Sequence, residues 1–170
     1  MLKSMLVLAA VAALAVPMAA LADGTPTPAS TANQLCSQQK TDMGAASFAA
    51  LYGTNASKSN AFGKCVSKNA KVAAAAVTNA AKTCAAERAS DPAAFATKYG
   101  TSGKAGSKGA DKNAFGKCVS GAVKQATTAQ AAKVASAAAT CKAAKKADAA
   151  AFAAKYSSFG KCVSVAAKTK

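Results

Sequence analysis

The sequence predicts an all-α protein with long antiparallel amphipathic helices, short flanking helices and three disulfide-stapled repeats of Cys, Phe and Tyr. Three observations support this fold class. Long segments are dominated by Ala with Lys, Gln and Val, and Ala has the highest helix propensity of all residues. Six cysteines form an even set in a short chain, which is typical of a disulfide framework. The cysteines also belong to a motif that occurs three times.

The N-terminal segment 1–22 is predicted to be a signal peptide. Lys3 precedes an apolar run over residues 5–16, and a small-residue stretch ends at Ala22, where we expect cleavage. The apolar run is shorter than the roughly 20 residues that a membrane span needs. The sequence therefore predicts a secreted, extracytoplasmic protein without a membrane span.

The remainder of the chain is expected to form one domain. We predict a flexible linker over residues 23–33 and a single helical, disulfide-stapled repeat domain over residues 34–170. Removing Lys3 from a chain of formal net charge +16 leaves about +15. Arg88 is the only arginine, and lysines favour diffuse attraction over the bidentate recognition that arginine provides. The charge therefore points to anionic partners, without indicating sequence-specific readout.

The repeated motif consists of Cys, then Phe-x-x-x-Tyr, a loop of variable length, and Phe-Gly-Lys-Cys-Val-Ser. The final segments begin at Phe62, Phe115 and Phe159. Every aromatic residue of the chain lies inside the motif; the remaining ones form the pairs Phe48 with Tyr52, Phe95 with Tyr99, and Phe152 with Tyr156. Because the aromatic residues accompany the cysteines, we expect them to pack beside the disulfides and not to serve as stacking platforms for a ligand.

Two long helices are predicted over residues 62–90 and 115–147, and a short one after Asp91-Pro92, where Asp is suited to the N-cap and Pro to the first helical position. At about 100° per residue, each long helix has an apolar face and an opposite lysine face. Lys133 is an exception that falls on the apolar side. The expected apolar faces comprise Phe62, Val66, Ala70, Ala73, Val77 and Cys84 in the first helix, and Phe115, Val119, Val123, Ala126, Val134 and Cys141 in the second.

Helix length restricts the disulfide pairing. Cys65 and Cys84 would lie ~28 Å apart on one helix, whereas a disulfide requires Cα atoms within roughly 7 Å. The same argument separates Cys118 from Cys141. The simplest pairing that remains joins the end of each helix to the start of the next, as Cys36–Cys65, Cys84–Cys118 and Cys141–Cys162.

The residues offer little to catalysis or to metal binding. The chain has no His, its single Glu is Glu87, and the other acids are scattered. Neither a Cys-x-x-Cys pair nor a phosphate-binding glycine motif is present. We therefore expect a protein that is not an enzyme, with no cofactor, no metal and no small-molecule substrate. The sequence does not indicate an oligomeric state.

The lysine faces are the main functional signal. They suit two interpretations, of which the first is a secreted interaction or structural protein that binds a polyanion, such as a wall polymer, a nucleic acid or an acidic surface. The alternative is a passive extracellular scaffold or surface component whose lysines only keep an Ala-rich protein soluble. The candidate polyanion-binding residues are Lys64, Lys68, Lys71 and Lys82 on the first long helix, and Lys117, Lys124, Lys142 and Lys146 on the second.

Overall fold

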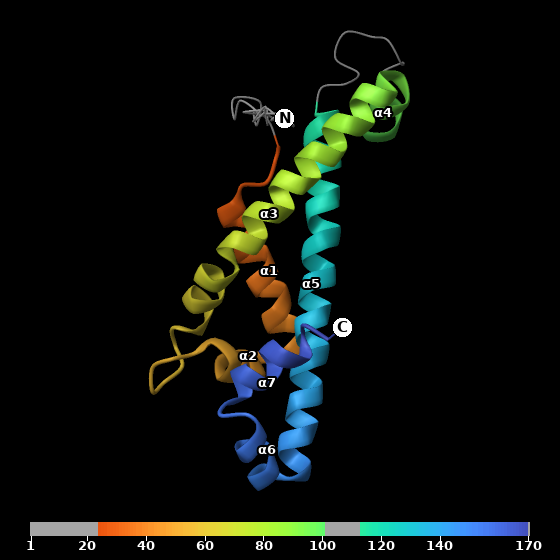
Figure 1. Cartoon of the computed structure of the whole chain (residues 1–170). Helices are drawn as coiled ribbons and strands as arrows, with labels where there is room; N and C mark the ends of the chain where they lie inside the picture. Colours follow the sequence, from red (N-terminus) through yellow and green to blue (C-terminus); the bar gives the residue numbers. More distant parts are fainter. Residues whose placement is uncertain (1–23, 101–112, 170) are drawn as a thin grey trace, which may run out of the picture.

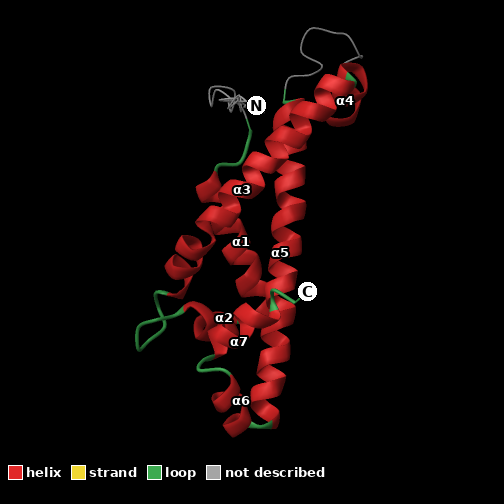
Figure 2. Cartoon of the chain, in the orientation of Figure 1, coloured by secondary structure: helices red, strands yellow, loops and turns green. Residues whose placement is uncertain are grey.

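A computed structural model describes residues 24–100 and 113–169, and over these ranges the protein consists of seven helices without a strand (Figure 2). The all-α class is therefore confirmed, while the predicted signal peptide lies outside the described residues. The helices are α1 Pro28–Met43, α2 Ala45–Tyr52, α3 Ala61–Ser90, α4 Pro92–Tyr99, α5 Ala114–Ala147, α6 Ala149–Lys155 and α7 Phe159–Ala166.

The two long helices predicted from the Ala-rich segments are present as α3 and α5, of 30 and 34 residues. Figure 1 shows that α3 rises toward α4 while α5 descends from that end of the molecule. The two helices lie close together at this end and diverge toward the other, where α1 lies between them (Figure 1). The short helices α6 and α7 pack against the lower half of α5, and α2 packs against α1, α3 and α7 (Figure 1).

Helix α1 corrects the expectation of a linker that extends to residue 33. The helix begins at Pro28, so residues 28–33 are helical. Its start is stabilised by a reciprocal cap, in which Thr27 Oγ1 accepts from Ser30 N at 3.1 Å and Ser30 Oγ accepts from Thr27 N at 3.0 Å. Helix α1 packs against both α3 and α5, and its buried residues are Thr31, Ala32, Leu35, Cys36 and Gln39.

Helices α1, α3 and α5 each end at a residue that is also the N-cap of the following short helix. Gly44 separates α1 from α2 with φ of 79°, a left-handed value that glycine adopts without a Cβ clash. Asp91 ends α3 and caps α4, because its Oδ1 accepts from Ala94 N at 2.9 Å. Asp148 does the same between α5 and α6, accepting from Ala151 N at 2.8 Å. The predicted N-cap at Asp91 is therefore confirmed.

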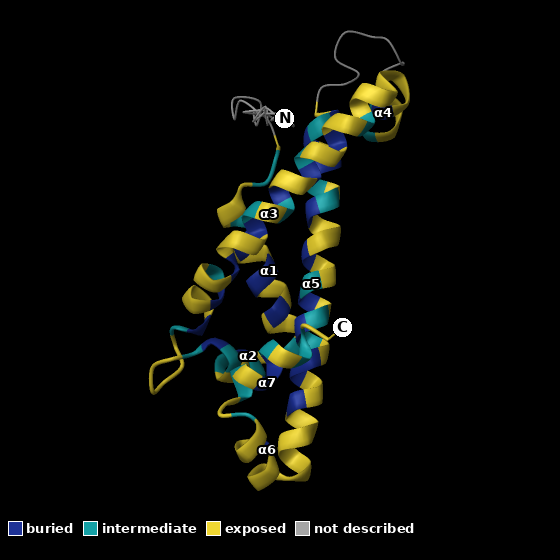
Figure 3. Cartoon of the chain, in the orientation of Figure 1, coloured by how far each residue is buried: buried dark blue, intermediate teal, exposed yellow. Residues whose placement is uncertain are grey.

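The core consists of three hydrophobic clusters, each built around one disulfide. The bridges Cys36–Cys65, Cys84–Cys118 and Cys141–Cys162 have Cα–Cα distances of 5.9, 6.0 and 6.0 Å, and they are the predicted pairs. Figure 3 shows buried residues along the facing sides of α1, α3 and α5, with exposed residues over most of α6. Met43 and Leu51 contact both the first and the third cluster, which joins these two parts of the core.

The aromatic pairs lie against the disulfides as expected. The ring centroids are 5.0 Å apart for Phe48 and Tyr52, 4.8 Å for Phe95 and Tyr99, and 5.2 Å for Phe152 and Tyr156. Two features of the predicted apolar faces are wrong, however. The side chain of Phe62 is 38% exposed, and Ala70 and Ala126 are exposed while their neighbours Asn69 and Thr127 are buried. The buried face of α3 advances mainly in steps of four residues from Ala61, and this places Asn69 in the seam.

We expect Phe95→Ala to lower the free energy of unfolding by ~3–5 kcal/mol, because Phe95 is 2% exposed and fills the cluster beside Cys84–Cys118. Lys71→Ala serves as the control and should change it by less than about 0.5 kcal/mol, since Lys71 is exposed. Urea denaturation of the oxidised proteins measures both values. Equal, small effects would contradict the placement of the aromatic residue in the core.

Candidate functional site

All eight candidate lysines have exposed side chains. Lys64, Lys68, Lys71 and Lys82 lie on the side of α3 that faces away from its buried residues, and we call this set the α3 stripe. From the helical rise of 1.5 Å per residue, the stripe extends over ~27 Å. The structure thus brings these four lysines onto one helix face, as the sequence predicted.

The second set also follows one line along its helix. Lys117, Lys124, Lys142 and Lys146 lie on one side of α5, flanking its buried seam, and we call this set the α5 stripe. It spans ~44 Å, with a gap between its second and third members. Lys133 lies on the other flank of the seam and is partly buried, in line with its position in the sequence pattern.

Acidic side chains do not neutralise the two stripes. Within residues 24–100 and 113–169 there is a single ion pair, between Lys98 Nζ and Glu87 Oε1 at 2.8 Å, and it belongs to neither stripe. Glu87 also accepts from Tyr99 Oη at 3.1 Å. These hydrogen bonds, that of Lys98 first, hold the pKa of the Glu87 carboxyl below its usual value. The only Glu of the chain is thus committed to a contact between α3 and α4.

Some cationic groups lie over aromatic rings instead of facing only solvent. Lys68 Nζ lies 5.7 Å from the centroid of the Tyr52 ring, and the Arg88 guanidinium lies 5.2 Å from that of Phe115. Exposed contacts of this kind contribute about 0.5–1 kcal/mol. Lys68 therefore has a second role in the α3 stripe, since it covers the ring of a residue that belongs to the first cluster.

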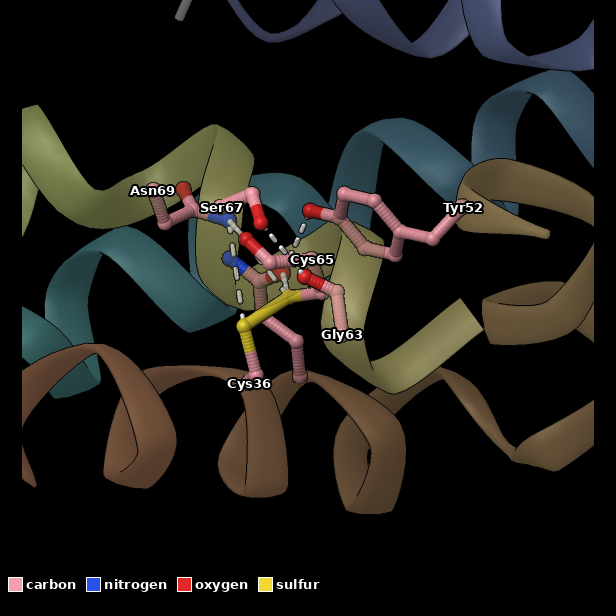
Figure 4. The surroundings of a disulfide bond; sticks show 7 residues. Cys36, Tyr52, Gly63, Cys65, Ser67 and Asn69 are labelled. Carbon is pink, nitrogen blue, oxygen red and sulfur yellow. Dashed lines mark hydrogen bonds between the residues drawn. A yellow bond between two sulfur atoms is a disulfide. The ribbon is translucent and has the colours of Figure 1, made fainter. Parts of the chain in front are cut away.

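A buried polar cluster surrounds the Cys36–Cys65 bridge, and the sequence analysis did not anticipate it (Figure 4). Gln39 is 0% exposed, and its Oε1 accepts from Tyr52 Oη at 2.6 Å. Asn69 Nδ2 donates to Cys65 O at 3.0 Å and lies 3.4 Å from Cys65 Sγ. Both amides lie one helical turn after a bridge cysteine, a spacing that would have signalled their position.

Burial of this cluster raises the pKa of the Tyr52 phenol, and the hydrogen bonds with Asn69 and Gln39 oppose the rise only in part. The hydroxyl thus remains a neutral donor to Gln39, whose Nε2 has no hydrogen-bond partner among the described residues. A buried amide left partly unsatisfied costs about 1–3 kcal/mol. The bridge of the first repeat is therefore surrounded both by the apolar side chains of its cluster and by a buried polar arrangement that is only partly satisfied.

Neither a metal centre nor a membrane-crossing element is found where the chain is described. No three acidic, His or Cys residues there lie in positions to hold a metal ion together. None of the described helices combines the length and the apolar character that crossing a bilayer requires. The exposed functional groups of these residues are mainly lysines, amides and hydroxyls.

The Tyr52 phenol should ionise later in the native protein than in the unfolded chain. Because its folded pKa is raised above the ordinary value of 10.0, the native state holds this proton longer, so the free energy of unfolding falls as the pH rises above about 10. Absorbance at 295 nm, recorded against pH with and without guanidinium, measures phenolate formation in both states. Tyr52→Phe should remove the part of the native absorbance rise that occurs at the highest pH. Coincident curves for the native and unfolded wild type would show that the pKa of Tyr52 is not raised by folding.

Comparison with known proteins finds no match to this chain, whether among protein-family models, curated proteins or solved structures. The interpretation of the two lysine stripes and of the polar cluster at Cys36–Cys65 therefore depends on the geometry of this protein alone.

Proposed function

We propose that this protein is exported, is not an enzyme, and binds anionic polymers through the lysine stripes of α3 and α5. The main support for this proposal is that eight exposed lysines follow two helix faces, and that none of them forms an ion pair with a described residue. A surface of unpaired charges on rigid helices releases condensed counterions from any polyanion that it contacts, which favours association.

The disulfides support the proposed location. Three bridges within one short chain are characteristic of proteins that fold in an oxidising compartment outside the cytosol. The rigidity of the helices also favours binding. Lysines held in a line on a helix lose less conformational freedom on contact with a polymer than lysines on an unstructured segment. A stapled helical framework therefore suits a protein that presents fixed charges to a polymer outside the cell.

Recognition of this kind should depend on charge and not on the order of bases or monomers. The chain has a single arginine, Arg88, which lies over the ring of Phe115, and the rings of Phe95 and Tyr99 contact each other. With one arginine over a ring, and Phe62 as the single exposed aromatic residue among those described, the protein offers little for bidentate contacts to base edges or for stacking on bases. Duplexes of different sequence should bind with equal affinity.

Replacing Lys64, Lys68, Lys71 and Lys82 together with Gln should weaken binding to duplex DNA and to heparin. Each lysine that contacts a phosphate contributes about 0.9 to the slope of log affinity against log salt, so the slope should fall by up to about four. Fluorescence anisotropy of a labelled duplex at several salt concentrations measures both quantities, and circular dichroism checks that the helices persist.

A variant with the same loss of charge outside the stripes is the control. Replacing the exposed residues Lys40, Lys58, Lys155 and Lys168 with Gln also removes four positive charges. This variant should retain more of the affinity and of the salt slope than the α3 variant. Equal losses would show that net charge alone matters, and an absence of binding at low ionic strength would leave the passive scaffold as the function.

A further inference from the structure

An open groove of about 780 Å³ lies between α1 and α5. Both helices descend side by side at this point (Figure 1). Polar side chains at helical spacing form most of its lining, with one cation, Lys124, and no aromatic or acidic residue. The α1 side contributes Ser30, Asn33, Gln34, Ser37, Gln38 and Thr41, and the α5 side contributes Ser120, Lys124, Thr127 and Thr128.

Several of the polar groups that line the groove are already hydrogen-bonded within the protein. Ser120 Oγ donates to Gly24 O at 2.9 Å, which ties the segment before α1 to α5. Gln38 Nε2 donates to Asp42 Oδ1 at 2.7 Å, and Thr127 Oγ1 donates to Val123 O at 2.9 Å. These contacts fix the borders of the groove and leave their side chains with less capacity for a ligand.

Five other lining residues have no such partners. No described residue forms a hydrogen bond with the side chains of Asn33, Gln34, Ser37, Lys124 or Thr128, and all five are exposed. Residues four apart on a helix lie on one face about 6 Å apart along the axis, as do Asn33 with Ser37 and Lys124 with Thr128. The two helices thus present facing rows of unused donors and acceptors on the two sides of one groove.

This set of groups suits a particular ligand chemistry. Carboxamides and hydroxyls both donate and accept, so they pair best with ligand hydroxyls, whereas Lys124 is a single point charge for a carboxylate or a phosphate. No aromatic side chain lines the groove, and its apolar residues are Val123 and Pro26, so it differs from the aromatic pockets that many small molecules use. A polyanion without hydroxyl groups can accept from Lys124 and from the amide and hydroxyl donors, but it has nothing to donate to their oxygens, so it uses only part of this set.

We propose that this groove binds a segment of an anionic polymer that also carries hydroxyl groups, such as a uronic acid glycan or a polyol phosphate. This inference rests on the proposed function, because the lysine stripes supply the general attraction and the groove adds selectivity for the hydroxylated chain. Lys124 belongs to both the groove and the α5 stripe, so a polymer held along α5 is already positioned over the groove.

The test compares three labelled polymers: polygalacturonate, poly(glycerol phosphate) and inorganic polyphosphate, which has no hydroxyl side groups. Asn33→Ala combined with Thr128→Ala should lower the affinity for a hydroxylated polymer by about tenfold, which corresponds to roughly 1.4 kcal/mol. Affinity for polyphosphate should fall by a smaller factor, because this polymer loses only the donors of the two side chains and none of their acceptors. Comparing the first two polymers identifies whether carboxylate or phosphate is the preferred anionic group.

Asn79→Ala combined with Thr78→Ala is the matched control, because it removes the same groups from an exposed part of α3 outside the groove. It should leave all three affinities unchanged, and thermal unfolding should show that both double variants remain folded. If the polymers bind but the groove variant behaves like the control, the groove inference is wrong and the lysine proposal stands. If no polymer binds at low salt, both are wrong.

Discussion

The disulfide bridges hold together helices whose contact surfaces are made largely of small side chains. Of the side chains that are fully buried, Phe95 and Leu35 are the largest, and much of the rest of the core is Ala, Val and Cys. Small side chains remove little apolar area from water per residue, so they stabilise the packed state weakly. Each bridge, by closing a loop of 21 to 34 residues, contributes ~3–4 kcal/mol.

The positions of the bridges also explain where the larger residues lie. Each of the three clusters contains a Phe one turn before a Tyr, packed beside its disulfide. The cluster at Cys84–Cys118 also contains Val77 of α3 and Val123 of α5, which extend it along the two helices. The largest apolar side chains thus gather near the bridges, and the outer faces of α3 and α5 carry lysines.

Much of this architecture could be predicted from the sequence, because its signals are local. Ala-rich segments predicted α3 and α5, Asp91-Pro92 predicted a capped helix start, and helix length restricted the cysteine pairing. Helix α1 was underestimated because residues 28–33 contain Ser, Thr and Asn, which have modest helix propensity. Packing against α3 and α5 overrides that preference, and such a contact depends on the tertiary structure.

Among the functional features too, those that depend on local sequence could be predicted and those that depend on tertiary contacts could not. Exposure of the lysines followed from helical periodicity, whereas the groove and the polar cluster arise where α1 meets other helices. Phe62 was assigned to the core from its position in the repeat, yet its ring is partly exposed because the buried seam of α3 passes through Ala61 and Cys65. Shifting the buried seam by one residue decides whether Ala61 or Phe62 is buried, and the repeated motif does not specify the position of the seam.

The order of the bridges along the chain bears on how the protein matures. Each cysteine is joined to its immediate neighbour among the six, and no bridge spans another. A chain that emerges from its N-terminus exposes Cys36 and Cys65 before the later four. For an oxidant that acts on thiols as they appear, each cysteine therefore meets its native partner before the next pair emerges, which favours the native bridges over crossed ones.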